Sequence, residues 1–426
     1  MYLLWFEGAM AMAFETWVGP GYMSALAGEL KIPVIWVTLL TALPWVGASG
    51  QILALSRIAQ IQSLRRFCVK LAAAARLLWA IPIFAGWAAG LYCMNTGKPF
   101  PIEAWFTLTV VTASIASLVG SVSGIAWLSW MRRLIPSILH GRFFGVRQGF
   151  TMGSVMLANL IAAALLGYQT GGYRIGLAII GALALTAAFF STRWLSFVPD
   201  EPSVSPGVID EVRKPNYTIA EMVALFKGEG RSFSKYMIFS ACFQMAVTVA
   251  GPYFPYYFTH EVKISLSTFA FWSILTNLGA FVSARFWGRT LDRSDPHRVL
   301  WAGCLLISLS PLPYAFASFQ AQYYIGPIEY FFNGVAWSAF QIAMLKILYR
   351  EVPKATDTLF FSVYTALFGL GGALGTFGGG FLADQFLKLS GFQTLWWVAS
   401  GIRLSVFLSA AYYFSVHSRI PAKLAS

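Results

Sequence analysis

Twelve long apolar runs make up most of this chain, and they restrict its fold more than any other feature of the sequence. A helix needs about 20 mainly apolar residues to cross the hydrocarbon core of a bilayer. Only 11% of the 426 residues are charged, against about 25% in soluble proteins. We therefore expect an all-α polytopic membrane protein with twelve transmembrane helices, at about residues 3–28, 33–55, 68–93, 104–130, 146–168, 174–198, 235–259, 266–289, 299–319, 323–349, 358–386 and 392–416.

Neither the charged residues nor the cysteines indicate nucleic-acid binding, metal binding or a disulfide framework. The net charge of +13 comes from basic residues in short loops between apolar runs, so nucleic acid is not expected as a partner. The cysteines form no Cys-x-x-Cys or Cys/His group, so we expect neither a metal site, a cofactor nor a disulfide framework: Cys68, Cys93, Cys242 and Cys304. The first run lacks a basic segment before it and contains Glu7 and Glu15, which indicates a retained helix and not a signal peptide.

The distribution of lysine and arginine predicts the orientation of the helices. Loops after the second, fourth, eighth and tenth runs are richer in these residues than the loops on the other side of the membrane. Basic loops stay in the cytoplasm. We therefore expect these loops, the central linker and both termini to be cytoplasmic.

The chain divides into two six-helix halves, residues 1–198 and 235–426, joined by a polar linker at 199–234. Matching loops of the halves are similar: one register aligns Arg57 with Arg289, and Arg66 with Arg298. This pattern indicates a duplicated unit, as in many transporters, although chance similarity of basic loops is the alternative. Within the linker, 217–226 has helical apolar spacing, which predicts a short interfacial helix or, alternatively, a flexible linker.

The loop after the eighth run carries a recognisable signature. It reads Gly288-Arg-Thr-Leu-Asp292-Arg293, with Arg298 five residues further on, and resembles the loop signature of the major facilitator superfamily in bacterial members. The first-half copy has Ser56 in place of the glycine. The resemblance implies the major facilitator fold, alternating access, a monomer and a bacterial inner membrane location. It also implies that Gly288, Asp292, Arg293 and Arg298 act as a cytoplasmic gate; the alternative is that they only set topology.

Ionisable residues inside the apolar runs need a partner or a function, because a charge is costly in the bilayer centre. Glu15 lies mid-helix, just before Gly19-Pro20-Gly21, and is our first candidate for proton coupling; the alternative is a structural hydrogen bond. Two buried arginines have an uncertain role, Arg76 and Arg403. For Arg403, an anionic substrate group and a structural acid are both open.

A polar stripe runs along the tenth helix, where residues recur every fourth position: Glu329, Asn333, Trp337 and Gln341. This spacing places them on one face. The family resemblance implies that the first, fourth, seventh and tenth helices line the pathway. We therefore expect a substrate site made of Trp127, Gln244, Glu329, Asn333 and Gln341, with proton coupling through Glu15 or Glu329. Polar packing between helices is the alternative.

The glycine-rich eleventh helix is interpreted as a packing surface. Seven glycines lie between residues 369 and 380, and Gly371-x-x-x-Gly375 is a spacing used in close helix contacts.

No phosphate-binding loop or hydrolase motif is present, so we do not expect an enzyme. The sequence predicts a secondary active transporter of a small organic solute, a zwitterion or organic anion by preference. A lipid or lysolipid flippase and a transporter-like solute sensor are the alternatives.

Overall fold

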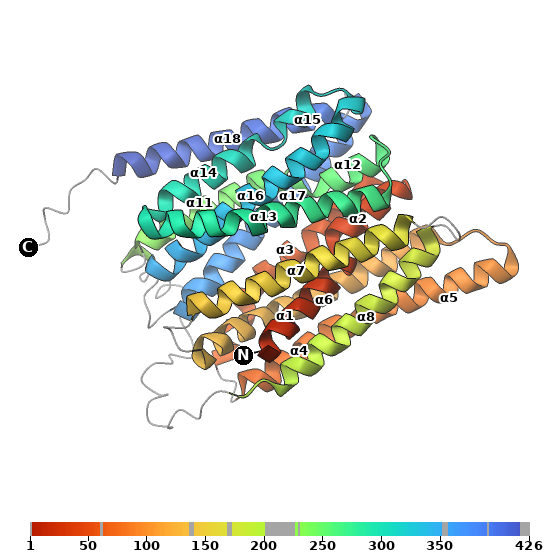
Figure 1. The fold of residues 1–426 in the computed structure, drawn as a ribbon, viewed down its shortest axis with the longest axis horizontal. Helices are drawn as coiled ribbons and strands as arrows, with labels where there is room; N and C mark the ends of the chain where they lie inside the picture. The colour runs from red at the N-terminus through yellow and green to blue at the C-terminus, as the bar shows by residue number, and fades with distance from the viewer. Residues whose placement is uncertain are drawn as a thin grey trace, which may run out of the picture.

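The protein is a bundle of helices that run roughly parallel to one another (Figure 1). The computed structural model describes residues 2–59, 63–135, 140–167, 173–200, 226–228, 231–351, 357–389 and 392–417, and these ranges contain no strand. The interfacial helix expected at 217–226 falls almost entirely outside the described residues.

The first six passes are built from eight helices. The first pass consists of α1 and α2, and the third of α4 and α5. The bounds are α1 Tyr2–Val18, α2 Pro20–Glu29, α3 Val34–Ala59, α4 Leu64–Leu78, α5 Ala80–Thr96, α6 Ile102–Leu134, α7 His140–Gly167 and α8 Tyr173–Phe197.

The last six passes repeat this plan, with the seventh and ninth passes broken. The bounds are α11 Arg231–Thr248, the 3₁₀ turn η2 Gly251–Tyr253, α12 Phe254–His260, α13 Leu266–Arg293, α14 Pro296–Leu309, α15 Leu312–Phe316, α16 Phe319–Glu351, α17 Asp357–Leu389 and α18 Phe392–His417. The breaks follow the sequence, because proline cannot donate a backbone hydrogen bond inside a helix. Pro20, Pro252 and Pro311 mark three of them.

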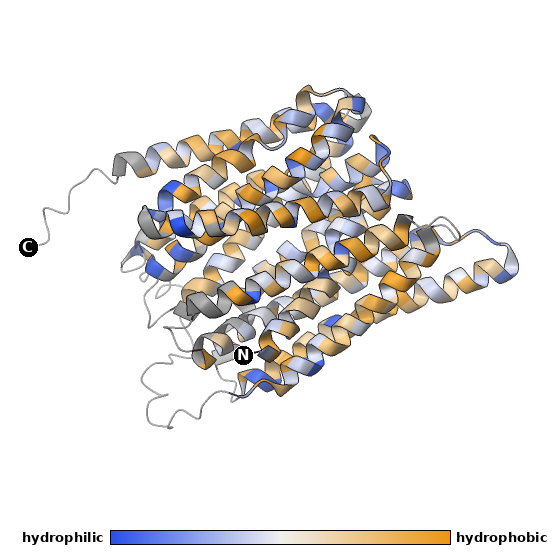
Figure 2. Ribbon diagram, viewed as in Figure 1, coloured by the Kyte–Doolittle hydropathy of each residue, from blue (hydrophilic) through white to orange (hydrophobic). Residues whose placement is uncertain are grey.

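The helices have the length and polarity of membrane spans. Within the described residues, ten helical stretches are long and apolar enough to cross a bilayer, and Val34–Ser49 is a shorter apolar helix. The broken first pass and α3 complete the twelve. Large apolar side chains such as Leu77, Phe189 and Tyr412 are exposed on the outside of the bundle, where lipid would cover them, and apolar colour extends over most helices in Figure 2. The protein is therefore an integral multi-pass membrane protein, and the predicted fold class is confirmed.

The two sets of six passes meet along two seams. Helix α3 packs against α17, and α7 packs against α13. These are the second and eleventh passes and the fifth and eighth passes. Exchanging the two sets converts one seam into the other, so the bundle has the pseudo-twofold arrangement expected of a duplicated unit.

The glycines of α17 allow it to contact two neighbours closely. A Cβ atom added at Gly371 or Gly375 would collide with backbone carbonyls of α11, and one added at Gly379 with the carbonyl of Val249, directly after α11. Atoms added at Gly369 and Gly372, on another face, would collide with α3 around Trp45. Helix α17 therefore joins its own set of passes to the other set through two surfaces that lack side chains.

We expect Gly375→Leu to lower the thermal midpoint of the detergent-purified protein, because the new side chain would enter the backbone of α11. Overpacking of this kind costs about 1–3 kcal/mol. The matched control is Gly378→Leu, since nothing lies within 4 Å of a Cβ atom at Gly378. Equal midpoints for the two variants would show that the glycine contact does not support the fold.

Candidate functional site

A cavity of about 640 Å³ lies between the two sets of passes near the middle of the bundle. Its volume is in the range of about 300–1,000 Å³ that is usual for small-molecule sites. Both sets contribute to its wall. The first contributes Pro20, Gly21, Ser24, Thr41, Pro44 and Trp45, and the second contributes Gln244, Val247, Thr248, Gly251, Pro252, Pro255, Trp337, Phe340, Gln341, Met344, Leu348, Tyr364 and Phe368.

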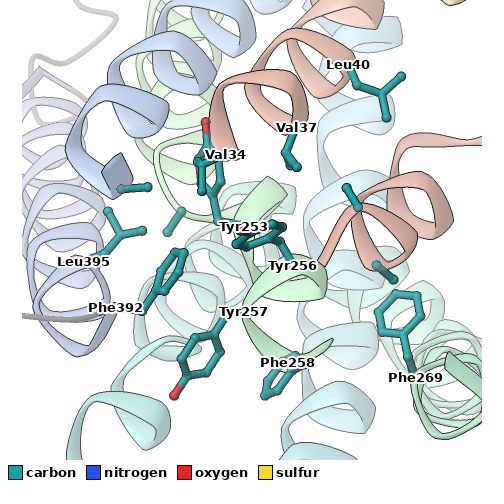
Figure 3. Close-up of a cluster of buried hydrophobic side chains, with 14 of the residues drawn as sticks. Val34, Val37, Leu40, Tyr253, Tyr256, Tyr257, Phe258, Phe269, Phe392 and Leu395 are labelled. Atoms are coloured by element: carbon teal, nitrogen blue, oxygen red, sulfur yellow. The ribbon is translucent and has the colours of Figure 1, made fainter. Parts of the chain in front are cut away.

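One end of the bundle is sealed above this cavity. We call it the opposite end; it holds the end of α2, the start of α3, and α12. Here a large apolar cluster combines residues of both sets, including Val34 and Val37 of α3 with Tyr253 and Phe258 (Figure 3). A hydrogen bond from the Thr259 hydroxyl to the carbonyl of Ala25 also joins the two sets, at 3.0 Å. The cavity is therefore closed on this side.

The other end, which carries the basic loops and both termini, is packed differently. We call it the basic end. The buried clusters near it, within the described residues, each belong to one set of passes only. The cavity reaches Leu348, three residues before the end of α16, and Tyr364, in the second turn of α17. The cavity therefore opens toward the basic end.

The predicted substrate residues fall into two groups. Gln244 and Gln341 line the cavity, and so does Trp337 of the same polar stripe. Trp127, Glu329 and Asn333 are not among the lining residues. The sequence reasoning missed the first-set wall, of which Trp45 is the largest member. The sequence feature that could have indicated this wall is Pro44, a proline in the middle of an apolar run.

Trp127 belongs to a charged cluster inside the first set of passes. The guanidinium of Arg147 lies over its ring, 4.6 Å from the centroid. Arg147 and Arg76 each approach the buried carboxylate of Glu7, at 3.6 Å. Arg76 also donates to the hydroxyl of Thr192, at 2.8 Å. Arg76, whose role was uncertain from the sequence, therefore takes part in an ion-pair network across α1, α4 and α7.

Glu15 faces the interior of the bundle and is nevertheless exposed. Phe6, on the outer surface of α1, contacts Phe150 and Trp194. Glu15 is nine residues further on, which is about two and a half turns, so the two side chains project from opposite faces. Glu15 interacts electrostatically with Arg76 and Arg147. An exposed carboxylate on the inner face has access to water inside the bundle.

Glu329 lies in a separate buried site in the second set of passes. Its carboxylate accepts a hydrogen bond from the hydroxyl of Tyr314, at 2.9 Å. The side-chain oxygen of Asn333, one turn along α16, is buried without a hydrogen-bond partner. Glu329 is therefore held by α15 instead of facing the cavity.

Arg403 of α18 connects the ends of two helices, α11 and α14. Its guanidinium donates to the carbonyl of Val247 at 2.9 Å and to the carbonyl of Ile307 at 3.1 Å. Pro311 cannot donate to Ile307 as a helical residue would, and Val247 lies in the last turn of α11, where carbonyls lack helical partners. Glu329 balances the charge of Arg403 electrostatically. These contacts give Arg403 a structural role.

The predicted gate residues lie at the basic end of α13 and the start of α14. Gly288 faces open space, and Arg298 is exposed. The side chains of Asp292 and Arg293 lie outside the described residues.

The same junction contains a side-chain network that the sequence reasoning missed. Asp295 caps α14, and the Nδ1–H of His297 donates to its carboxylate at 2.6 Å. Nε2 of the neutral imidazole can then accept from the hydroxyl of Tyr236 on α11. Partial burial acts to raise the pKa of Asp295, but the hydrogen bonds from the backbone and ring of His297 outweigh it and lower that pKa. Arg350 of α16 lies 3.8 Å from the carboxylate.

The described residues contain no group of three or more His, Cys, Asp or Glu side chains that could hold a metal ion.

Comparison with known proteins identifies the architecture. The sequence model of the Major Facilitator Superfamily matches residues 236–425. A solved structure of a D-xylose-proton symporter is similar over 96% of this chain and 95% of its own, with a TM-score of 0.70 and 13% identity. The chain has the major facilitator fold. The resemblance seen in the loop signature is thereby confirmed.

Other major facilitator structures are similar at the same level. The xylose transporter XylE from E. coli, in a partially occluded inward-open conformation, has a TM-score of 0.67 and 15% identity and covers 100% of this chain and 98% of its own. The nucleoside transporter NupG has a TM-score of 0.60 and 14% identity, with 97% of both chains covered. A search of curated proteins finds no significant sequence match. Identities this low show the fold alone.

We expect Arg403→Met to destabilise the protein by about 3–5 kcal/mol, because it leaves two buried carbonyls and the charge of Glu329 uncompensated. Thermal unfolding in detergent measures the effect, with Arg66→Met, an exposed arginine of α4, as the control. The double variant Arg403→Met/Glu329→Gln should recover part of the loss, since no charge then remains unpaired. A single variant as stable as the parent protein would contradict the structural role.

Proposed function

We propose that the protein is a secondary active transporter that moves a small organic solute by alternating access. The observation that carries this proposal is the cavity between the two sets of passes, which is sealed at one end and open toward the other. A solute bound there is exposed to one side of the membrane at a time. Rocking of the halves 1–198 and 235–426 about the two seams would transfer the access.

The distribution of basic residues gives the direction of this opening. Loops rich in lysine and arginine stay in the cytoplasm, so the basic end and both termini are cytoplasmic, and the cavity is open to the inside. A bacterial inner membrane and a monomer agree with the family resemblance. Gly288, Asp292, Arg293 and Arg298 would close the cytoplasmic side when the halves tilt.

Proton coupling is assigned to Glu15. It is a carboxylate with access to water, and its nearest charged neighbours in the first half are Arg76, Arg147 and Glu7. Protonation of Glu15 would change the balance of charge in this network and so favour a different packing of α1 against α4 and α7. Glu329 is the second candidate, but its burial against Tyr314 leaves it less access to protons.

A soluble substrate agrees better with the cavity than a lipid does. The wall contains two glutamines and two tryptophans from both halves, groups that orient a polar solute. The solved symporter and nucleoside transporter of the same fold carry soluble solutes according to their descriptions.

Alternating access can be tested with a cross-link at the opposite end. A Cβ atom at Gly28 would lie 3.3 Å from the Cβ atom of Thr259, close to disulfide geometry. In a background without Cys93 and Cys242, we expect the pair Gly28→Cys/Thr259→Cys to form a disulfide on mild oxidation. The linked protein should lose solute-driven proton flux in proteoliposomes and regain it on reduction. Equal flux in the linked and reduced states would contradict alternating access, and the two single-cysteine variants are the controls.

We expect Glu15→Gln to remove the pH dependence of transport while the thermal midpoint stays unchanged, because glutamine keeps the shape of the side chain but cannot bind the proton. Solute-driven proton flux is measured with an internal pH indicator between pH 5.5 and 7.5. Glu103→Gln, at the exposed start of α6, is the matched control. A pH dependence that persists in Glu15→Gln would exclude Glu15 from the coupling.

A further inference from the structure

We infer that the cavity binds an uncharged solute with flat apolar faces and several hydrogen-bonding groups. This inference names the substrate class for the transport proposed above and rests on that proposal. Three observations support it: the unpaired polar groups of the wall, the absence of charge among the described lining residues, and the placement of the aromatic side chains.

The wall contains polar groups that the protein itself does not satisfy. Ser24 has a buried hydroxyl without a hydrogen-bond partner. Within the described part of the chain, the carboxamides of Gln244 and Gln341 and the indole N–H groups of Trp45 and Trp337 also make no hydrogen bond to protein. The two threonines of the wall differ, because Thr41 and Thr248 donate to carbonyls at 2.8 and 2.9 Å.

These unpaired groups define a pattern that a ligand can complement. A carboxamide offers two donors and an acceptor, an indole one donor, and a hydroxyl both kinds. They project from α2, α3, α11 and α16, on both halves. Buried polar groups need a partner, which is water in the empty site and the solute in the loaded one. Hydroxyl and carbonyl groups on the edge of a solute would fit this pattern.

The lining residues that the structure describes carry no charge, and two groups of charged residues inside the bundle are balanced within their own halves. In the first half, Glu7 and Glu15 face Arg76 and Arg147. In the second, Glu329 balances Arg403. A charged solute would have to leave water without a counter-ion, and the effective penalty is several kcal/mol per ion. The preference for a zwitterion or an organic anion, drawn from the sequence, is therefore replaced by a preference for an uncharged solute.

Aromatic rings form another part of the cavity wall. Trp45 of α3 packs edge-on against Phe368 of α17, with centroids 6.0 Å apart. Trp337 packs edge-on against Phe340, at 5.7 Å, on the wall formed by α16. Rings of this kind cover the apolar faces of a cyclic solute while its edge meets the polar groups.

The inference is tested by thermal-shift binding with matched pairs of solutes. Uridine is compared with uridine 5′-phosphate, and glucose with glucuronate, because the members of each pair keep the same rings and differ at one charged group. We expect a neutral member to stabilise the protein and its charged partner not to do so. Gln244→Leu and Gln341→Leu should weaken the binding by about tenfold each, the effect of losing one hydrogen bond to a ligand. Gln320→Leu, exposed at the start of the same helix α16, should bind as the parent protein does.

The outcomes separate this inference from the transport proposal. Binding of the charged members in preference to the neutral ones, binding of neither class, or neutral binding that is unchanged in both cavity variants would overturn the inference. Proton flux driven by a charged solute would retain the transporter and overturn only the substrate class. Binding of a neutral solute without any flux in proteoliposomes would retain the substrate class and overturn the transport proposal.

Discussion

The hydrocarbon core of a bilayer contains no water that could hydrogen-bond with backbone groups. This constraint explains which contacts hold the broken helices in place. Each break frees carbonyls that another element must satisfy. Arg403 binds two of them, on Val247 and Ile307. Tyr253, within the break of the seventh pass, donates through its hydroxyl to the carbonyl of Thr376 on α17, at 2.7 Å. Because these partners come from other helices, the broken segments are held in place by tertiary contacts. The breaks let α2 and α12 turn toward each other and seal the opposite end.

The structure separates its charges from its binding surface. The ion pairs lie within one half or the other, around Glu7 in the first and around Glu329 in the second. The cavity between the halves is lined by uncharged polar and aromatic groups. A change of protonation can therefore alter the packing of the first half without placing a charge on the solute. This arrangement suits a transporter in which the proton and the solute occupy different sites.

The two halves contact each other in different ways at the sealed end and along the seams. The seal at the opposite end is a large apolar cluster that combines both halves, so opening it exposes apolar surface that must be reburied at the basic end. The seam between α3 and α17 has glycines on its α17 side, where Gly369 and Gly372 contact α3 closely. Small residues let helices approach each other closely. At the basic end, Asp295 and His297 connect the start of α14 to Tyr236 of α11, so these two helices are held together inside the second half.

The sequence determined the helices and their number, because an apolar run of about 20 residues in a chain with few charges has no other stable environment. The glycines of α17 and the prolines at the breaks could also be interpreted directly, since their effects are local. The polar stripe on α16 predicts one face for Gln341 and Trp337, and both residues line the cavity. The same helical period could not tell which part of the stripe faces the cavity.

Only the tertiary structure decided where each buried charge goes. Glu7 and Arg147 are 140 residues apart, and no local pattern predicts that Glu7 receives two arginines. The sequence leaves both an anionic substrate group and a structural acid open for Arg403, and its carbonyl partners on distant helices decide its role. Trp45 belongs to the wall because α3 packs against α17. The physical reason is the same in each case: the periodicity of one helix defines its faces, while the partner of each face depends on the packing of all twelve passes.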